Sequence, residues 1–367
     1  MCRLEFIHIS DIHFGMELKR GGTGIIRDAL LEVVDTCNQR GSELLLISGD
    51  LFHFIPDKKQ LKEVDYIFAK LLYTKTVIIA GNHDYMAKGG IYEGYEFESN
   101  TYIFKGGNEC IKGEELGINA DIYGVSYSGM YMKEKKDRDY FESNYQLDED
   151  RVNILLLHGG TKDQLDIDFK EFLDSRFDYV ALGHIHKGEM LGENVAYAGS
   201  LVALDHTEIG EHGYIVGNVD EMSAYPGKRT NLIFVPGKSR EYEEVTIELN
   251  QYMTVSGIKE RIISKICVEN TYYTLKFAGV CTHGKVVLEG KAGENALVLK
   301  ELLENEPVLE KIVGVVDMTR SFADVNELYL NNTDNIIGQF IGNVQSLEED
   351  EDMKELVMEY GLLALME

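Results

Sequence analysis

The stretch Leu44-Leu45-Leu46-Ile47-Ser48-Gly49-Asp50 joins a short apolar run to a glycine and a carboxylate. An apolar run of this length, bounded by polar residues, is typical of a buried parallel strand. Four more apolar runs end in the same way: Ile7–Ile9, Val77–Ala80, Ile154–Leu157 and Val180–Leu182. The motifs at the five ends are Asp11-Ile12-His13, Gly49-Asp50, Gly81-Asn82-His83-Asp84, His158-Gly159 and Gly183-His184-Ile185-His186. Ligands gather beyond the carboxyl ends of strands in an open α/β sheet, so these side chains are expected to converge on one edge.

The converging side chains are carboxylates, imidazoles and one amide, without cysteine. This donor set favours hard or borderline divalent ions, Mn²⁺ or Fe²⁺ and less strongly Zn²⁺. Asp50 follows a glycine that allows a sharp turn, so its carboxylate is suited to bridge two ions. Two ions ~3.5–4 Å apart can hold a bridging hydroxide and clamp a phosphate, which predicts a phosphoester hydrolase. The expected ligands are Asp11, His13, Asp50, Asn82, His158, His184 and His186.

Of the histidines in the five motifs, His83 is the one that is not expected to bind metal. We expect Asp84 to orient its ring, and His83 to act as the general acid for the leaving oxygen. Taken singly, an Asp-x-His or Gly-Asp pair is most often a surface feature. Five such motifs in one ordered series favour the metal site. His8 lies inside the first strand, where a core or sheet-face role is expected.

Length and composition bound the class of protein. The chain has 367 residues, more than the ~250–300 at which a single core stops growing, so several domains are expected. Its five cysteines are scattered and without Cys-x-x-Cys spacing, which is typical of a reducing compartment. No apolar run is long enough for a membrane helix, and a strand, Leu4–Ile9, is expected close to the start. A cytoplasmic protein without a leader or membrane partner is therefore expected.

The order of expected elements suggests four parts. Residues 1–220 alternate strands with helices, among them Gly24–Gln39 and Asp57–Leu72. Residues 221–242 are expected to form a linker with one strand, Leu232–Val235. Residues 243–320 are expected to form a small α+β domain, with helices over Val255–Ile266 and Glu294–Asn305. Residues 321–367 are expected to form acidic C-terminal helices.

The motifs resemble those of the calcineurin-like metallophosphoesterase superfamily: D-x-H, G-D, G-N-H-D/E, H and G-H-x-H. The resemblance implies an α/β fold, a β-sandwich flanked by helices. It also implies that one metal is held by Asp11, His13, Asp50 and His186. The other would be held by Asp50, Asn82, His158 and His184. Asp50 would bridge the two, and His83 and Asp84 would form the catalytic dyad.

Two further segments narrow the resemblance. Gly49-Asp50-Leu51-Phe52-His53 and Tyr197-Ala198-Gly199-Ser200-Leu201 are similar to segments of the SbcD-type DNA repair nucleases, with Ala198 where that family has proline. This implies a nucleoid-associated, Mn²⁺-dependent 3′–5′ exonuclease and single-strand endonuclease. In such an enzyme His53 would contact the phosphate or the nucleotide at the scissile end; the alternative is a histidine that only supports the ligands or lies at the surface. The resemblance also implies a homodimer through helix Asp57–Leu72, a DNA-capping role for 243–320, and an SbcC-type, SMC-like coiled-coil ATPase as the partner of the C-terminal helices.

The charge of the chain opposes DNA binding. Its net charge is −27, and acidic residues outnumber lysine by eleven to one in Ser321–Glu367. That acidic end is either a solvated tail or a docking surface for a basic partner. Candidate phosphate contacts are Lys19, Arg20, Lys133, Lys135, Lys136, Arg138 and Lys187, although short runs of basic residues are more often solvated surface. A small-nucleotide phosphodiesterase or nucleotidase, and a non-catalytic scaffold, remain as alternatives to a DNA nuclease.

Overall fold

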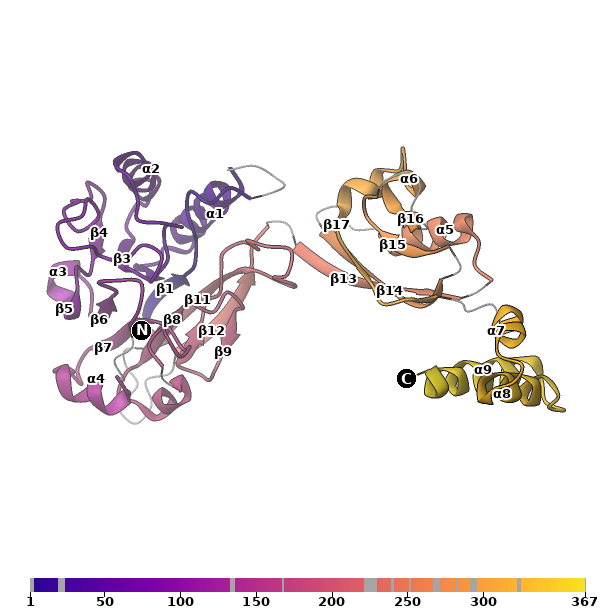
Figure 1. Cartoon of the computed structure of the whole chain (residues 1–367). Coiled ribbons are helices and arrows are strands. Elements are labelled where there is room, and N and C mark those ends of the chain that lie inside the picture. The colour runs from indigo at the N-terminus through magenta and orange to yellow at the C-terminus, as the bar shows by residue number, and fades with distance from the viewer. Residues whose placement is uncertain are drawn as a thin grey trace. The chain divides into compact units, whose positions relative to one another are not determined.

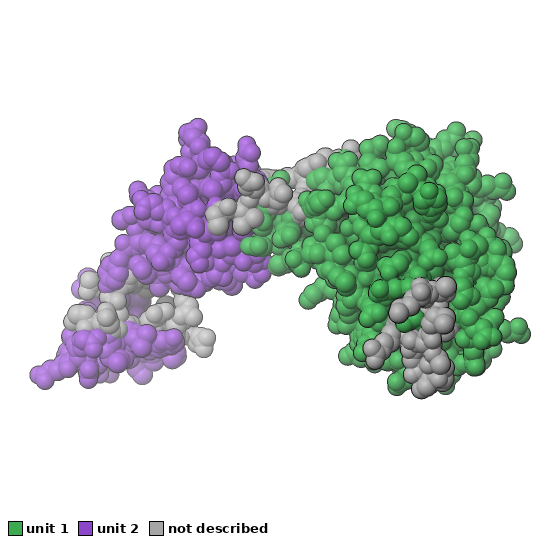
Figure 2. Space-filling model, turned by 180° about the vertical axis from the view of Figure 1, so that it is seen from behind, with its two compact units in different colours: residues 1–243, 269–272 green, residues 244–268, 273–367 purple. Residues whose placement is uncertain are grey.

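The computed structural model describes residues 3–18, 24–132, 136–166, 168–220, 230–238, 241–250, 252–266, 271–281, 283–290, 296–321 and 325–366. The chain divides into two compact units, which Figure 2 colours separately. The first comprises residues 1–243 with 269–272, and the second comprises 244–268 with 273–367. None of the described helices combines the length and the hydropathy that crossing a bilayer requires.

Two six-stranded sheets form the centre of the first unit. The first sheet has the order β12-β11-β1-β2-β3-β4, and β1 to β4 run parallel. Its strands are β1 (Arg3–Ile9), β2 (Leu44–Ser48), β3 (Lys75–Ile79), β4 (Thr101–Ile103), β11 (Gly213–Asp220) and β12 (Thr230–Pro236). The register pairs Ile9 with Ile47 and Ser48 with Ile79, so the motifs after β1, β2 and β3 begin at the same edge. The strand expected within the linker is β12, which pairs with β11.

The second sheet has the order β5-β6-β7-β8-β10-β9. Strands β6, β7, β8 and β10 run parallel, and β5 and β9 close the two edges as antiparallel strands. The bounds are β5 (Gly107–Ile111), β6 (Ala120–Ser126), β7 (Val152–His158), β8 (Tyr179–Gly183), β9 (Glu189–Met190) and β10 (Val195–Tyr197). His158 pairs with Gly183, so the last two histidine motifs also start side by side.

The two sheets pack face to face and helices cover their outer faces (Figure 1). Alternate residues of a strand point to opposite faces, so Phe6 and Leu46 join the core between the sheets while Ile7 and Leu45 pack against helices. The covering segments are α1 (Gly24–Arg40) and α2 (Lys58–Phe68) on the first sheet, and α4 (Arg138–Asn144) and η1 (Phe169–Asp174) on the second. A short α3 (Gly113–Leu116) precedes β6. This is the α/β sandwich flanked by helices that the sequence predicts.

Helix α2 begins with a capping box and ends earlier than expected. The Asp57 side chain accepts a hydrogen bond from the Gln60 backbone, and the Gln60 side chain accepts one from Asp57 N–H. The sequence predicts helix to Leu72, but α2 ends at Phe68. The side chain of Asn38 on α1 accepts the Leu72 N–H at 2.9 Å, which draws the segment after Phe68 away from the helical path.

The second unit contains an α+β core and three C-terminal helices. Its larger sheet has the order β13-β14-β17, with β18 on β14, and helix α5 packs on its core. The elements are β13 (Glu241–Leu249), α5 (Val255–Lys265), β14 (Thr271–Cys281), β15 (Lys285–Val287), β16 (Ala296–Val298), α6 (Leu299–Leu302), η2 (Pro307–Lys311), β17 (Ile312–Asp317) and β18 (Arg320–Ser321). The C-terminal helices are α7 (Val325–Asn331), α8 (Ile336–Gln345) and α9 (Glu351–Met366).

The helix expected over Glu294–Asn305 is wrong. Residues 291–295 lie outside the described part, and Ala296–Val298 form β16. This strand pairs in parallel with β15, Val286 opposite Leu297, and only Leu299–Leu302 are helical. Leu297 is buried in this pairing, so tertiary contact overrides the local helical pattern.

His8 links the two sheets inside the core, which confirms the expected core role. Its Nδ1 lies 2.7 Å from the Tyr179 hydroxyl on β8, and its Nε2 lies 2.7 Å from Ser48 Oγ on β2. The residue is fully buried, and burial lowers the pKa of His8 from 6.5 to about 3. The ring is therefore neutral in the folded protein at neutral pH.

The buried ring of His8 should make folding stability depend on pH. Below pH 6.5 the unfolded chain binds a proton at His8, whereas the folded chain binds it only below about pH 3. The free energy of unfolding therefore falls as the pH falls through this range. Each pH unit costs about 1.4 kcal/mol. The free energy of unfolding of metal-free protein, measured with urea, should fall between pH 7.5 and pH 5.5. The fall should be about 1 kcal/mol smaller in His8→Gln than in wild type. An identical fall in both proteins would contradict this role.

Candidate metal centre

Three loops that follow β1, β2 and β3 bring the first ligands together. Asp11, His13 and Asp50 all have positive φ, at 48°, 49° and 50°. Non-glycine residues rarely adopt this conformation, and they do so chiefly where surrounding contacts hold them at functional sites. Here the Asp11 N–H donates to the Gly49 carbonyl at 3.2 Å, and the His13 N–H donates to the Asp50 carbonyl at 3.0 Å. The first two motifs are therefore hydrogen-bonded to each other through their backbones.

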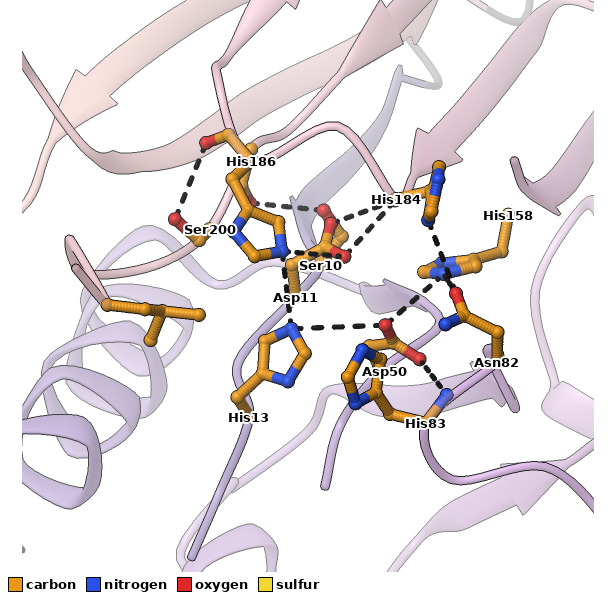
Figure 3. A network of polar contacts seen from close by, with 12 residues as sticks. Ser10, Asp11, His13, Asp50, Asn82, His83, His158, His184, His186 and Ser200 are labelled. Atoms are coloured by element: carbon orange, nitrogen blue, oxygen red, sulfur yellow. Dashed lines mark hydrogen bonds and ion pairs between the residues drawn. The ribbon is translucent and has the colours of Figure 1, made fainter. Parts of the chain in front are cut away.

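The second sheet supplies three histidines to the same edge. His158 is the last residue of β7, and His184 and His186 follow β8. The His158 Nδ1 lies 2.9 Å from the carbonyl of Ser48 on the first sheet. The His184 N–H donates to the Asp11 carboxylate at 3.0 Å. Side chains from both sheets thus meet in one cluster, as Figure 3 shows.

Asp50 lies at the centre of this cluster. Its Oδ2 lies 3.4 Å from His158 Nε2 and 3.8 Å from His13 Nε2. Its Oδ1 accepts a hydrogen bond from the His83 backbone N–H at 2.9 Å (Figure 3). The Asp50 carboxylate thus lies between an imidazole from the first sheet, His13, and one from the second sheet, His158. A ligand that bridges two ions requires this arrangement.

The donor atoms around Asp50 fit divalent cations. His13 Nε2 lies 3.3 Å from His186 Nε2, and Asn82 Oδ1 lies 3.0 Å from His158 Nε2 and 3.2 Å from His184 Nδ1. The donor atoms of Asp11, His13 and His186 lie within 4.8 Å of one another, as do those of Asp11, Asp50 and His158. Donor atoms this close together can share a bound cation. The nitrogen and oxygen set suits Mn²⁺, Fe²⁺ or Zn²⁺.

Two glycines of the motifs allow this close approach. Gly49 has φ +94°, and a Cβ atom there would lie 2.3 Å from His158 Nδ1. A Cβ atom on Gly81 would lie 2.1 Å from Asp50 Oδ1. Any side chain at either position would displace a ligand, so the cluster depends on these two glycines.

The cluster is electrostatically coupled. Burial by itself raises the pKa of the Asp50 carboxyl, but the charge of His158 and the hydrogen bonds to Asp50 hold that pKa well below its usual range. Burial acts against protonation of His158, yet the Asp50 charge raises the pKa of His158 to about 9. Burial lowers the pKa of His13 to about 3. Because a metal ligand must be deprotonated, a bound cation would take the place of the proton on His158.

His83 and Asp84 are close to the cluster but are not hydrogen-bonded as expected. The Asp84 carboxylate accepts hydrogen bonds from the backbone N–H groups of Gly81 and Phe52, at 2.8 and 3.1 Å. Burial, and then the charge of Asp50, raise the pKa of Asp84 to about 7. The His83 ring instead lies with Nδ1 3.0 Å from the His53 carbonyl. The expectation that Asp84 orients the His83 ring directly is therefore corrected: Asp84 shapes the loop, and the His53 carbonyl orients the ring.

His53 extends the cluster towards solvent. Its Nδ1 lies 3.2 Å from His13 Nδ1, and its ring stacks on that of His83 with centroids 5.5 Å apart and planes at 20°. Donor atoms of His13, His53 and His83 lie within 4.8 Å of one another. His53 is half-buried and His83 is exposed, so a molecule bound at the metals can reach both.

Sequence reasoning missed Glu208. The His186 Nδ1 lies 2.5 Å from Glu208 Oε1, and Glu208 Oε2 accepts the Leu204 N–H at 2.8 Å. Burial acts against protonation of His186, but the hydrogen bond to Glu208 raises its pKa. A carboxylate on the far nitrogen of a ligating histidine fixes the ring and makes it a better ligand. Glu208 belongs to no motif, so only the folded chain reveals it.

Glu208→Ala should weaken metal binding without removing a ligand. The loss of this contact leaves the His186 ring free to turn, so metal affinity should fall about 10- to 100-fold. Isothermal titration calorimetry of metal-free protein with Mn²⁺ measures the change in affinity. Glu211→Ala, which removes an exposed carboxylate three residues further along the chain, is the control and should bind metal as the wild type does. Unchanged affinity in Glu208→Ala would contradict the role.

The expected phosphate contacts are only partly described. Lys19, Arg20, Lys133 and Lys135 lie outside the described residues. Lys136 is buried, lies 5.5 Å from the Tyr140 ring centroid and lines a cavity of about 490 Å³, which does not match the exposed contact expected of it. Arg138 pairs with Asp139 at 3.0 Å. Lys187 is exposed and directly follows His186.

The fold and the cluster together define a metallophosphoesterase. The profile of the calcineurin-like phosphoesterases matches residues 4–188, and the chain belongs to this family. It is 27% identical over 387 residues to the DNA double-strand break repair protein Mre11 of Methanocaldococcus jannaschii, covering 97% of this chain and 98% of that one. It is 24% identical over 395 residues to the uncharacterized metallophosphoesterase YhaO of Bacillus subtilis, covering 96% and 88%. Among solved structures, a dimetal phosphatase from Danio rerio aligns over 63% of this chain and 98% of its own, with 10% identity and a TM-score of 0.35.

Proposed function

We propose that this chain is a Mn²⁺-dependent DNA nuclease subunit that acts in double-strand-break repair. It would cut duplex ends as a 3′–5′ exonuclease and single strands as an endonuclease. The observation that carries the proposal is His53, which extends the metal cluster with a further imidazole whose Nδ1 lies 3.2 Å from His13 Nδ1. The similarity to Mre11 over nearly the full length, second unit included, supports DNA as the substrate.

The side chains of the cluster would form two metal sites that share Asp50. One ion would be held by Asp11, His13, Asp50 and His186, and the other by Asp50, Asn82, His158 and His184. Two divalent ions bound there would neutralise phosphate charge and lower the pKa of a bound water.

His83 would supply the proton for the leaving oxygen. Its contact with the His53 carbonyl places a proton on Nδ1, because a carbonyl can only accept a hydrogen bond. The proton that is transferred must then come from Nε2 of the doubly protonated ring. His53 would contact the scissile phosphate beside it.

Two exposed apolar surfaces support the proposed assembly. Tyr66 on α2, with Leu72 and Tyr73 just beyond its end, are 61%, 66% and 79% exposed, which fits a homodimer through this helix. The C-terminal helices pack on a small core but leave further apolar side chains exposed: Leu330, Ile336, Met353, Leu356 and Tyr360. We propose that an SMC-like coiled-coil ATPase covers this face. Because the chain carries a net charge of −27, that partner would also supply part of the DNA-binding surface.

One set of assays tests the proposed function. The chain, with Mn²⁺ and with or without an SMC-like coiled-coil ATPase from the same genome, is given linear duplex DNA, single-stranded DNA, cyclic nucleotides and bis-p-nitrophenyl phosphate. We expect cleavage of both DNA substrates, loss with a chelator and recovery with added Mn²⁺. Hydrolysis of cyclic nucleotides without any cleavage of DNA would overturn the proposal in favour of a small-nucleotide phosphodiesterase. No Mn²⁺-dependent hydrolysis of any substrate would favour a scaffold.

A further inference from the structure

Phe54 exposes an aromatic ring to solvent directly beside the candidate metal centre. The residue is 70% exposed, whereas Phe52, two positions earlier, is fully buried. The Phe54 ring centroid lies 4.4 Å from that of His53, whose Nδ1 lies 3.2 Å from the ligand His13. A single exposed apolar residue is ordinary on a protein surface. This one is distinguished by its contact with the imidazole cluster.

The segment that carries Phe54 is fixed at both ends. On one side, the His53 N–H donates to the Phe14 carbonyl at 3.2 Å, in the bridge between Phe14 and Phe52. On the other side, Asp57 forms the capping box that begins α2. Only two residues separate Phe54 from that cap. The ring is thus held near the metal ligands and does not sit on a long loop.

Three rings lie next to one another at the solvent-facing side of the cluster, in the order His83, His53 and Phe54. His83 and His53 are nearly parallel, at 20°, and Phe54 meets His53 edge to face at 61°. We infer that Phe54 stacks against an unpaired nucleobase next to the scissile phosphodiester, an inference that rests on the proposed nuclease function. The base of that nucleotide lies beside its phosphate, and the phosphate would lie at His53 and His83. Phe54 would then select nucleotides that are single-stranded or frayed from a duplex end, because a base inside a duplex already stacks on both faces.

The charge of the chain favours stacking as the means of holding this nucleotide. A net charge of −27 opposes the backbone of DNA, and the contacts that lysine and arginine make with phosphates weaken as salt increases. Stacking of a base on an aromatic ring needs no charge and accepts any base. The contribution of Phe54 should therefore be independent of sequence and nearly independent of salt concentration.

The test compares wild type, Phe54→Ala and Phe54→Tyr on two single-stranded oligonucleotides. One carries a base at every position, and the other is abasic at the nucleotide next to the cleaved bond. For Phe54→Ala, the ratio of kcat/KM on the first substrate to kcat/KM on the second should fall about 5- to 100-fold, the range for loss of one stacked base. Phe54→Tyr should restore the ratio. An unchanged ratio in Phe54→Ala would overturn the inference.

A second readout does not depend on cleavage. A 2-aminopurine at the same position should lose fluorescence when it stacks on Phe54, with Ca²⁺ in place of Mn²⁺ to prevent cleavage. Quenching by wild type that is absent in Phe54→Ala supports the stack, and equal quenching in both overturns it. Ile233→Ala, which removes another exposed apolar side chain, on β12, is the control and should behave as wild type.

Two results would separate this inference from its foundation. Failure of the wild type to cleave any oligonucleotide, while it hydrolyses bis-p-nitrophenyl phosphate, would overturn the proposed nuclease function and the inference with it. Normal cleavage by wild type with an unchanged ratio in Phe54→Ala would overturn only the inference. A shift of Phe54→Ala to a smaller oligomer would assign the ring to a contact between two copies and also overturn it.

Discussion

Asp50→Asn is expected to abolish metal-dependent hydrolysis. The Asp50 carboxylate lies within 3.8 Å of His13 and of His158, which are expected to bind different ions. Its loss therefore weakens both proposed metal positions. A bound ion supplies several kcal/mol of charge stabilisation, and each 1.36 kcal/mol is a factor of ten in rate. A fall in kcat of about 1,000-fold or more is expected with saturating Mn²⁺. Asparagine keeps the shape and one oxygen to accept the His83 N–H, so the fold should persist.

The measurement combines kcat on bis-p-nitrophenyl phosphate with the metal content of the purified protein. Asp121→Asn is a matched control because Asp121 is equally buried at the start of β6, where it accepts the Gly113 N–H and pairs with Lys112. That variant should lose stability and keep its metals. Asp50→Asn with both metals and at least a tenth of wild-type activity would rule out the bridging role.

His83→Ala is expected to slow cleavage of DNA by about 100- to 10,000-fold, the contribution of a positioned general acid. Metal content should stay the same, since the His83 ring is not among the proposed ligands. The loss should be much smaller for bis-p-nitrophenyl phosphate, because nitrophenolate leaves without needing a proton. This dependence on the leaving group separates proton donation from a general loss of the fold.

His206→Ala is the control for the loss of an imidazole. His206 is exposed, pairs with Asp205 and is not among the expected ligands, so this variant should cleave both substrates at the wild-type rate. Equal losses on DNA and on the nitrophenyl ester in His83→Ala would show that the ring positions substrate and does not donate the proton. An unchanged rate on DNA would refute any catalytic role of His83.

The convergence of the ligands could be predicted from sequence because it follows from a simple rule. Five apolar runs end in polar motifs, and within each of the two sheets the parallel strands place those ends side by side. That two sheets, and not one, supply the ligands was not predicted. Figure 3 shows Asp11, His13, Asp50, Asn82, His158, His184 and His186 gathered there. Their assignment to two particular ions stays a prediction, as do the division into four domains and the contacts with DNA.

What the sequence could not predict depends on contacts between distant segments. Glu208 approaches His186 only because the loop after β10 folds back, and no spacing rule relates the two. Asp84 is next to His83 in the chain, yet its carboxylate accepts two backbone N–H groups that a linear pattern does not reveal. The segment Ala296–Val298 has a helical pattern, but a neighbouring strand pairs with it. In each case a partner far away, or the backbone itself, decides between local choices.

The origin of the ligands in both sheets has a thermodynamic consequence. Asp11, Asp50 and Asn82 follow strands of the first sheet, while His158 and His184 belong to the second. A cation held by residues of both sheets binds the folded chain and not the unfolded one, so its binding free energy adds to the free energy of unfolding. Saturation at a hundredfold excess over Kd adds about 2.7 kcal/mol for each such site. Metal supply would then set the fraction of chains that are folded, and a cell short of metal would hold a thermodynamically less stable protein.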